Sequence, residues 1–205
     1  MKRFIYLISP KKITRNFYYD LTKVFKTKKV KFFQLRLKKV PKSKIIKIGK
    51  EIKKITKKFN VKLIINDSPK IAKKVNADGC HIGQLDPSIT YTKKILKKKI
   101  IGVTCHGSIK IVNKVIKNNP NYIAVGSFFK SELKPTAKKA TTKIIKQIRK
   151  KTKIPIVAIG GINDKNYKKL MSLGANYIAL SSFIWNNRSL KPKEALKKFK
   201  NENNS

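Results

Sequence analysis

Acidic side chains are the scarcest charged groups in this sequence. Nine Asp and Glu stand against 52 Lys and Arg, so the 205 residues carry a formal net charge of +43. The lysines are spread along the whole chain, and the sequence has no zinc-finger spacing, no RNA-binding signature and no basic tail. These absences argue against specific nucleic-acid recognition, although a barrel that binds nucleic acid through charge alone stays an alternative. We interpret most lysines as solvated helix faces, whose positive field draws small polyanions toward any pocket.

Cysteine and long apolar runs are also nearly missing. Cys80 and Cys105 form no C-x-x-C pair and lie in apolar surroundings, so we expect buried, inert thiols in a reducing compartment. No apolar stretch approaches the roughly 18 residues that suggest a membrane-spanning helix. The apolar run at residues 4–8 is too short for the core of a secretion signal, and no A-x-A site follows it. We therefore expect a cytoplasmic protein without membrane contact.

The sequence does contain a regular series of short β-branched runs. Most are continuously apolar rather than alternating, which is typical of strands buried on both faces of a parallel sheet. They occupy residues 4–8, 32–37, 63–66, 79–83, 100–104, 122–126, 154–161 and 177–182.

Amphipathic, lysine-rich segments separate these runs. In the clearest, at residues 44–59, apolar side chains recur at steps of three and four residues, as on one face of a helix. Ser43 and Ser68 stand where helix starts are expected, and Gly174 stands where a helix should stop. Similar spacers cover residues 108–116, 141–148, 167–173 and 192–199.

This alternation predicts an α/β fold. Eight strands with helical spacers make a (β/α)8 TIM barrel, here a single domain over residues 1–205 without an interdomain linker. An open, doubly wound sheet is the alternative, but no G-x-G-x-x-G turn follows the first strand.

One short segment holds a third of the acids. Residues 64–86 read IINDSPKIAKKVNADGCHIGQLD and contain Asp67, Asp78 and Asp86. Barrel chemistry occurs where the strands end, and Asp67 and Asp86 follow two neighbouring strands. Each could simply cap a helix, but two acids at adjacent strand ends suit Mg²⁺, which keeps several waters and bridges to substrate phosphates. Asp78 precedes Gly79 at the opposite strand end, where we expect a turn.

Gln34, Arg36 and Lys38 occupy alternate positions of the second strand and its exit. Alternation sends all three toward the barrel interior or its mouth, where buried cations require an anion. Arg supplies a planar fork for phosphate oxygens, and Lys supplies a point charge. The alternative is that Lys38 merely begins the loop while Arg36 pairs with an internal acid.

The last two strand ends predict a second phosphate site. Gly160 and Gly161 expose backbone N–H groups after the seventh strand, and Ser181 and Ser182 follow the eighth. This is the recurrent phosphate position of such barrels. The loop at residues 126–141 suits a flap over a phosphorylated ligand, although it could also be a solvated basic loop.

The fifth strand ends in two further polar residues, Thr104 and His106. His106 could be a general base, but a lone loop histidine is more often structural.

In their order along the chain, these residues resemble thiamine phosphate synthase. The match spans essentially the whole chain, and the motif at residues 77–86 is highly specific to the superfamily. The motifs are Q-x-R-x-K (34–38), I-N-D (65–67), A-D-G-x-H-I-G-Q-x-D (77–86), G-V-T-x-H (102–106), I-P-I-V-A-I-G-G-I (154–162) and a closing S-S (181–182).

The resemblance implies a coupling reaction. Its partners are small phosphorylated molecules: hydroxymethylpyrimidine pyrophosphate and thiazole phosphate join with Mg²⁺ as cofactor, giving thiamine phosphate and pyrophosphate. Asp67 and Asp86 would hold the metal. The implied catalytic residues are Arg36, Lys38, Thr104 and Lys134. The implied substrate contacts are Gln34, Arg36, Lys38, Asn66, Thr104, Ser131, Lys134, Gly161, Ser181 and Ser182.

The chain departs from the family pattern in two places. Residues 130–134 read KSELK where the family usually has P-T-x-T-K, and Ser68 stands where many members have a second Asp. The main rival is a thiazole tautomerase, a related barrel that needs the monophosphate site and a base such as His106. A tautomerase has no use for Q-x-R-x-K together with two aspartates, so the sequence favours the synthase.

Overall fold

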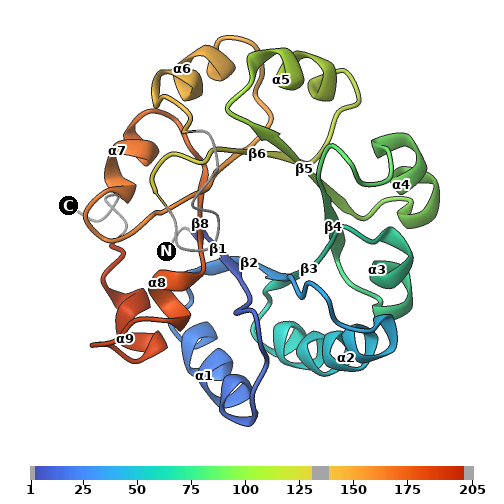
Figure 1. Ribbon diagram of the computed structural model, residues 1–205, viewed down its shortest axis with the longest axis vertical. Coiled ribbons are helices and arrows are strands. Elements are labelled where there is room, and N and C mark those ends of the chain that lie inside the picture. The colour runs from blue at the N-terminus through green and yellow to red at the C-terminus, as the bar shows by residue number, and fades with distance from the viewer. Residues whose placement is uncertain (1–2, 131–138, 201–205) are drawn as a thin grey trace.

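The chain forms a closed barrel of eight parallel strands in sequence order (Figure 1). This computed structural model describes residues 3–130 and 139–200. The barrel confirms the (β/α)8 prediction, and the open sheet is wrong. The strands are β1 (Ile5–Ile8), β2 (Val30–Leu35), β3 (Lys62–Asn66), β4 (Gly79–Ile82), β5 (Ile100–His106), β6 (Tyr122–Val125), β7 (Ile156–Ala158) and β8 (Tyr177–Leu180).

Helices surround the barrel on its outer side (Figure 1). All five spacers expected from the sequence contain a helix. None of the described helices combines the length and apolar character needed to cross a membrane. The helices are α1 (Arg15–Phe25), α2 (Lys42–Lys58), α3 (Pro69–Val75), α4 (Ile89–Leu96), α5 (Ile109–Ile116), α6 (Lys143–Arg149), α7 (Tyr167–Ser172), α8 (Ser182–Trp185) and α9 (Pro192–Lys197).

Successive side chains of each strand face opposite sides of the barrel wall. On β2, Phe33 and Leu35 join the large core between the barrel and the helices, whereas Phe32 joins the cluster inside the barrel. Both faces are thus covered, so both need apolar side chains. This is why the strands read as continuous apolar runs.

An apolar cluster with two tyrosines fills the barrel. Tyr122 lies directly over Gly102, where an added Cβ would come within 1.8 Å of the Tyr122 ring carbon Cζ. A glycine on β5 is therefore what makes room for this ring. The cluster consists of Tyr6, Phe32, Ile64, Tyr122, Ala124, Val157 and Ala179.

We expect Gly102→Ala to lower the free energy of unfolding by about 3 kcal/mol, because the methyl group must displace a fully packed ring. Urea unfolding of this variant measures the loss. Gly83→Ala is the matched control, since a Cβ there meets its nearest neighbour, Asp86 Oδ2, at 3.2 Å. Equal stability of the two variants would contradict the packing of Tyr122 on Gly102.

Serines cap three of the helices. Ser68, Ser88 and Ser108 each accept a backbone N–H from three residues further on. The expected cap at Ser68 is confirmed. The expected cap at Ser43 is wrong, because α2 already begins at Lys42, after a proline whose ring fixes φ.

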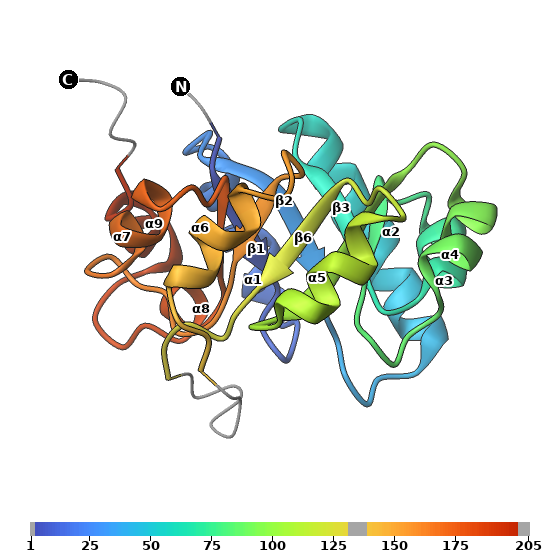
Figure 2. The ribbon, with the colours of Figure 1, turned by 90° about the horizontal axis from the view of Figure 1, so that it is seen from above.

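The strands run in one direction, so the loops that lead from strands to helices gather at one end of the barrel (Figure 2). β2 ends at Leu35 and β7 at Ala158, so Arg36, Lys38 and Gly160 follow their strands rather than extend them. We call the end of the barrel where these loops meet the rim.

Candidate active site

Asp67 and Asp86 bring two carboxylates together at the rim. Asp67 follows β3 with a left-handed φ of 64°, and its N–H donates to the carbonyl oxygen of His81 at 2.7 Å. Asp86 Oδ2 accepts the N–H of Gly83 at 2.7 Å. Burial raises the pKa of the Asp86 carboxyl, the Gly83 N–H lowers it, and the nearby Asp67 raises it again. The two acids thus concentrate negative charge at one place.

The interpretation of these acids as helix caps is wrong. Ser68 caps α3 and Ser88 caps α4, so neither carboxylate serves a helix. Across residues 3–130 and 139–200, no three His, Cys, Asp or Glu side chains gather as metal ligands. Two carboxylates without a third ligand of this kind suit a hard cation that keeps several waters and binds substrate phosphates, as Mg²⁺ does.

Cationic side chains lie beside this pair. Lys38 Nζ forms an ion pair with Asp67 Oδ2, and the two side chains are 55% and 30% exposed. An ion pair so exposed stabilises little, so Lys38 can exchange Asp67 for another anion at small cost. No ion pair between described residues involves Arg36, so none of the described acids pairs with it. Gln34, on β2, is buried.

Ser9 at the end of β1 is a structural part of the rim that no motif indicated. Its Oγ accepts the N–H of Arg36 at 3.0 Å and donates to the Arg36 carbonyl oxygen at 3.3 Å. Ser181 Oγ donates to the Ser9 carbonyl oxygen at 3.3 Å. Ser9 therefore connects the ends of β2 and β8, and its place directly after the first apolar run was the only signal for it.

Thr104 and Asn66 lie on either side of His81. Asn66 stands opposite His81 in the pairing of β3 with β4. Thr104 Oγ1 is 2.7 Å from His81 Nε2, and Gln84 Nε2 donates to the Thr104 carbonyl oxygen at 2.6 Å. These contacts join the ends of β3, β4 and β5 at the rim.

The ends of β7 and β8 form the second polar group of the rim. Gly161 has a left-handed φ of 59°, and an added Cβ would come within 2.3 Å of the Lys130 carbonyl oxygen. α8 starts at Ser182, and the first turn of a helix leaves backbone N–H groups without partners inside the helix. Because β1 lies between β2 and β8, the two polar groups flank β1.

Two of the expected substrate contacts, Ser131 and Lys134, lie outside the described residues. The described part of their loop reaches Lys130, which packs its backbone against Gly161. His106 is exposed, with a left-handed φ of 51°. Its side chain makes no hydrogen bond to any described residue.

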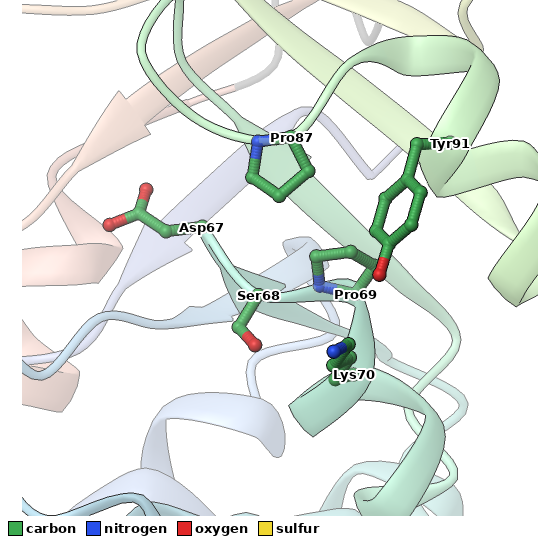
Figure 3. Close-up of a pocket in the computed structure, with 6 residues that line it drawn as sticks. All are labelled: Asp67, Ser68, Pro69, Lys70, Pro87 and Tyr91. Carbon is green, nitrogen blue, oxygen red and sulfur yellow. The ribbon is translucent and has the colours of Figure 1, made fainter.

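A cavity of about 470 Å³ is lined in part by Asp67. Ser68, Pro69, Lys70, Pro87 and Tyr91 complete its lining. In Figure 3 the Asp67 carboxylate points away from Pro69, Pro87 and Tyr91. The cavity is therefore a gap between the starts of α3 and α4, and the Asp67 carboxylate turns away from it.

A closed parallel barrel whose rim carries paired acids, cations and a glycine–serine cradle (Gly161, Ser181 and Ser182) is typical of TIM-barrel enzymes that bind phosphorylated substrates. The family model described as thiamine monophosphate synthase matches residues 5–184. The chain belongs to this family, and it is accordingly a transferase of thiamine biosynthesis.

Relatives of similar length carry the same description. A thiamine-phosphate synthase of Pelagibacter ubique is 52% identical over 200 residues, covering 97% of each chain. One from Picrophilus torridus is 34% identical over 195 residues, covering 95% of this chain and 94% of the relative. Among solved structures, a thiamine phosphate pyrophosphorylase from Pyrococcus furiosus superposes with a TM-score of 0.85 at 24% identity, over 96% and 93% of the two chains. At that identity the last match supports the fold alone.

Proposed function

We propose that the chain couples hydroxymethylpyrimidine pyrophosphate to thiazole phosphate, giving thiamine phosphate and pyrophosphate, with Mg²⁺ held by Asp67 and Asp86. The observation that carries the proposal is the pair of carboxylates beside Lys38, from three consecutive strand ends. An enzyme that binds a diphosphate through a metal ion needs both acids and cations in one place, whereas an isomerase that acts on a monophosphate does not.

The carboxylate pair fits the metal because Asp67 acts on Asp86 as a nearby like charge. Asp67 contributes to the raised pKa of Asp86, so a cation shared by both would relieve their repulsion. When bound, Mg²⁺ would supply positive charge to a diphosphate at the rim. Lys38 would then leave Asp67 for a phosphate oxygen, with little loss because the ion pair is exposed.

Arg36, Lys38 and Lys134 are proposed to bind the pyrophosphate end of the substrate. Gln34 and Asn66 would line the same side. The bond from the pyrimidine methylene carbon to the pyrophosphate oxygen breaks, and its electron pair leaves on the pyrophosphate. The cationic side chains stabilise this developing charge.

The glycine–serine cradle is proposed to hold the thiazole phosphate. Gly161, Ser181 and Ser182 lie across β1 from the diphosphate side, and Ser131 would join them. This placement lets the thiazole nitrogen face the methylene carbon, to which its lone pair forms the new bond. The nitrogen gives up no proton, so the reaction requires positioning more than a base.

The direct test is to mix both phosphorylated precursors with the protein and Mg²⁺ and to detect thiamine phosphate by mass. Omission of Mg²⁺ and addition of a chelator are the controls. Formation of thiamine phosphate only in the complete mixture supports the proposal. Its absence, with the precursors unchanged and the protein folded, would refute it. A barrel that only binds nucleic acid would instead show salt-dependent binding and no product.

His106→Ala should leave the coupling rate within about tenfold of the unchanged protein, below the usual contribution of a general acid or base. The side chain is exposed and hydrogen-bonds no described residue, so its loss should also cost little stability. Steady-state kinetics with both precursors measure the effect. A larger loss in a folded variant would favour the tautomerase alternative.

A further inference from the structure

A chain of hydrogen bonds runs through the barrel interior and ends at the rim. Tyr6 Oη lies 2.7 Å from Tyr122 Oη, and Tyr122 Oη lies 3.0 Å from His81 Nδ1. His81 Nε2 lies 2.7 Å from Thr104 Oγ1. Tyr6, Tyr122 and His81 are buried, and Thr104 is half-buried at the end of β5. Of these four residues, only Thr104 is among the substrate contacts that the family resemblance implies, and the coupling steps proposed above use none of them.

Packing holds Tyr122 in one position. Its ring covers Gly102, stacks on the His81 ring at a centroid distance of 5.7 Å and an interplanar angle of 15°, and meets the Tyr6 ring edge-on. Phe32 lies against it as well. Because the ring cannot turn away, its hydroxyl is fixed between Tyr6 and His81.

The direction of the hydrogen bonds follows from counting protons. Among the described residues, Tyr6 Oη has one hydrogen-bonding neighbour, the Tyr122 hydroxyl, and the apolar interior cluster surrounds it. If Tyr6 donates to Tyr122, then Tyr122 donates to His81 Nδ1, and His81 donates from Nε2 to Thr104. In this arrangement no buried N–H or O–H is left without an acceptor.

Other arrangements leave a buried donor without a partner. If Thr104 donates to His81 Nε2, the proton of His81 sits on Nδ1 and points at Tyr122. Either the Tyr6 or the Tyr122 hydroxyl then has no acceptor. A doubly protonated His81 has the same defect, and a buried donor without an acceptor is costly.

We propose that Tyr122 is a positioning residue that holds His81 in the Nε2–H form, so that the Thr104 hydroxyl accepts from His81 and keeps its own proton for the substrate. Thr104 then donates to an acceptor atom at the rim, such as a ring nitrogen of a pyrimidine. The identity of that acceptor rests on the proposed function, whereas the proton position on His81 does not.

Nitrogen NMR of histidine-labelled protein tests the proton position directly. The chain has two histidines, and His106→Gln assigns the remaining signals to His81. We expect the His81 spectrum of a protonated Nε2 and an unprotonated Nδ1. A proton on Nδ1 would overturn the inference, whether or not the protein makes thiamine phosphate.

Kinetics test whether Tyr122 acts through Thr104. Tyr122→Phe keeps the ring but removes the hydroxyl that donates to His81 Nδ1, so we expect kcat/KM for the pyrimidine substrate to fall about tenfold, equivalent to 1.4 kcal/mol. The KM for thiazole phosphate should stay unchanged. Tyr6→Phe is the matched control, because Tyr122 can still donate to His81, and we expect its loss to remain below about threefold.

The same substitution in a Thr104→Val background separates positioning from general structural damage. If Tyr122 acts through the Thr104 hydroxyl, Tyr122→Phe should cause no further loss of kcat/KM in that background. An equal tenfold loss in both backgrounds would show a purely structural role and refute the inference. Failure of the unchanged protein to couple the precursors would refute the proposed function instead.

Discussion

Asp67→Asn is expected to lower the rate of Mg²⁺-dependent coupling about a thousandfold, in the range seen when a preorganised charge-stabilising group is removed. Asparagine keeps the size of the side chain and tolerates the left-handed φ of 64° at this position, so the backbone should not be strained. It removes a negative charge that the proposed Mg²⁺ would require. Asp86→Asn should lower the coupling rate to a similar extent. Its amide oxygen can still accept the N–H of Gly83, so that hydrogen bond should remain.

The measurement is the coupling rate as a function of Mg²⁺ concentration, together with thermal unfolding. Asp78→Asn is the matched control, because Asp78 lies at the opposite end of β4 and pairs with Lys53 at 2.7 Å. Asp78 also accepts the N–H of Leu63 at 2.8 Å, so it joins two strands rather than only forming the expected turn. We expect this control to lose about 1 kcal/mol of stability. Its coupling rate should depend on Mg²⁺ as that of the unchanged protein does. Undiminished turnover of the rim variants would remove both aspartates as ligands.

Arg36→Ala is expected to raise the KM for hydroxymethylpyrimidine pyrophosphate about a hundredfold, because a charge-assisted, forked contact to phosphate is lost. The KM for thiazole phosphate should change little, since the cradle at Gly161 and Ser181 lies across β1. The backbone of Arg36 stays held by Ser9 in the variant, so the rim should keep its shape.

Two controls sharpen this result. Arg36→Lys keeps the charge without the planar fork. Its KM for hydroxymethylpyrimidine pyrophosphate should therefore lie between those of the alanine variant and the unchanged protein. Arg3→Ala removes a guanidinium that binds the carbonyl oxygens of Phe59 and Asn60, and neither KM should change. An equal rise in the KM for both substrates in Arg36→Ala would contradict the proposal of two separate phosphate-binding sites.

Much of the fold could be predicted because burial on both faces leaves a direct mark on a strand. All eight strands lie where continuous apolar runs predicted them, with boundaries that differ by a few residues. α1 was not singled out, although Phe17, Leu21 and Val24 have helical spacing, and its start lacks a side-chain cap to mark it. Boundaries depend on local caps and hydrogen bonds, so they are less visible in a pattern than burial is.

The local sequence did not decide whether the aspartates of the rim cap helices or present free carboxylates. An aspartate before a helix is compatible with a cap or with a free carboxylate, and only the observed hydrogen bonds of Ser68 and Ser88 separate the two. Ser9 carried no motif, because its partners, Arg36 and Ser181, are far away along the chain.

The sequence by itself determined the barrel and the set of polar residues at its rim, because strand periodicity and the order of strands are properties of the chain. Only the tertiary structure decided what those residues touch. Three sets of contacts join residues from different strands. They are the ion pair of Lys38 with Asp67, the contact of Asp67 with Asp86, and the series of hydrogen bonds from Tyr6 to Thr104. Closure of the barrel brings these side chains within a few ångströms, and no local pattern records that distance.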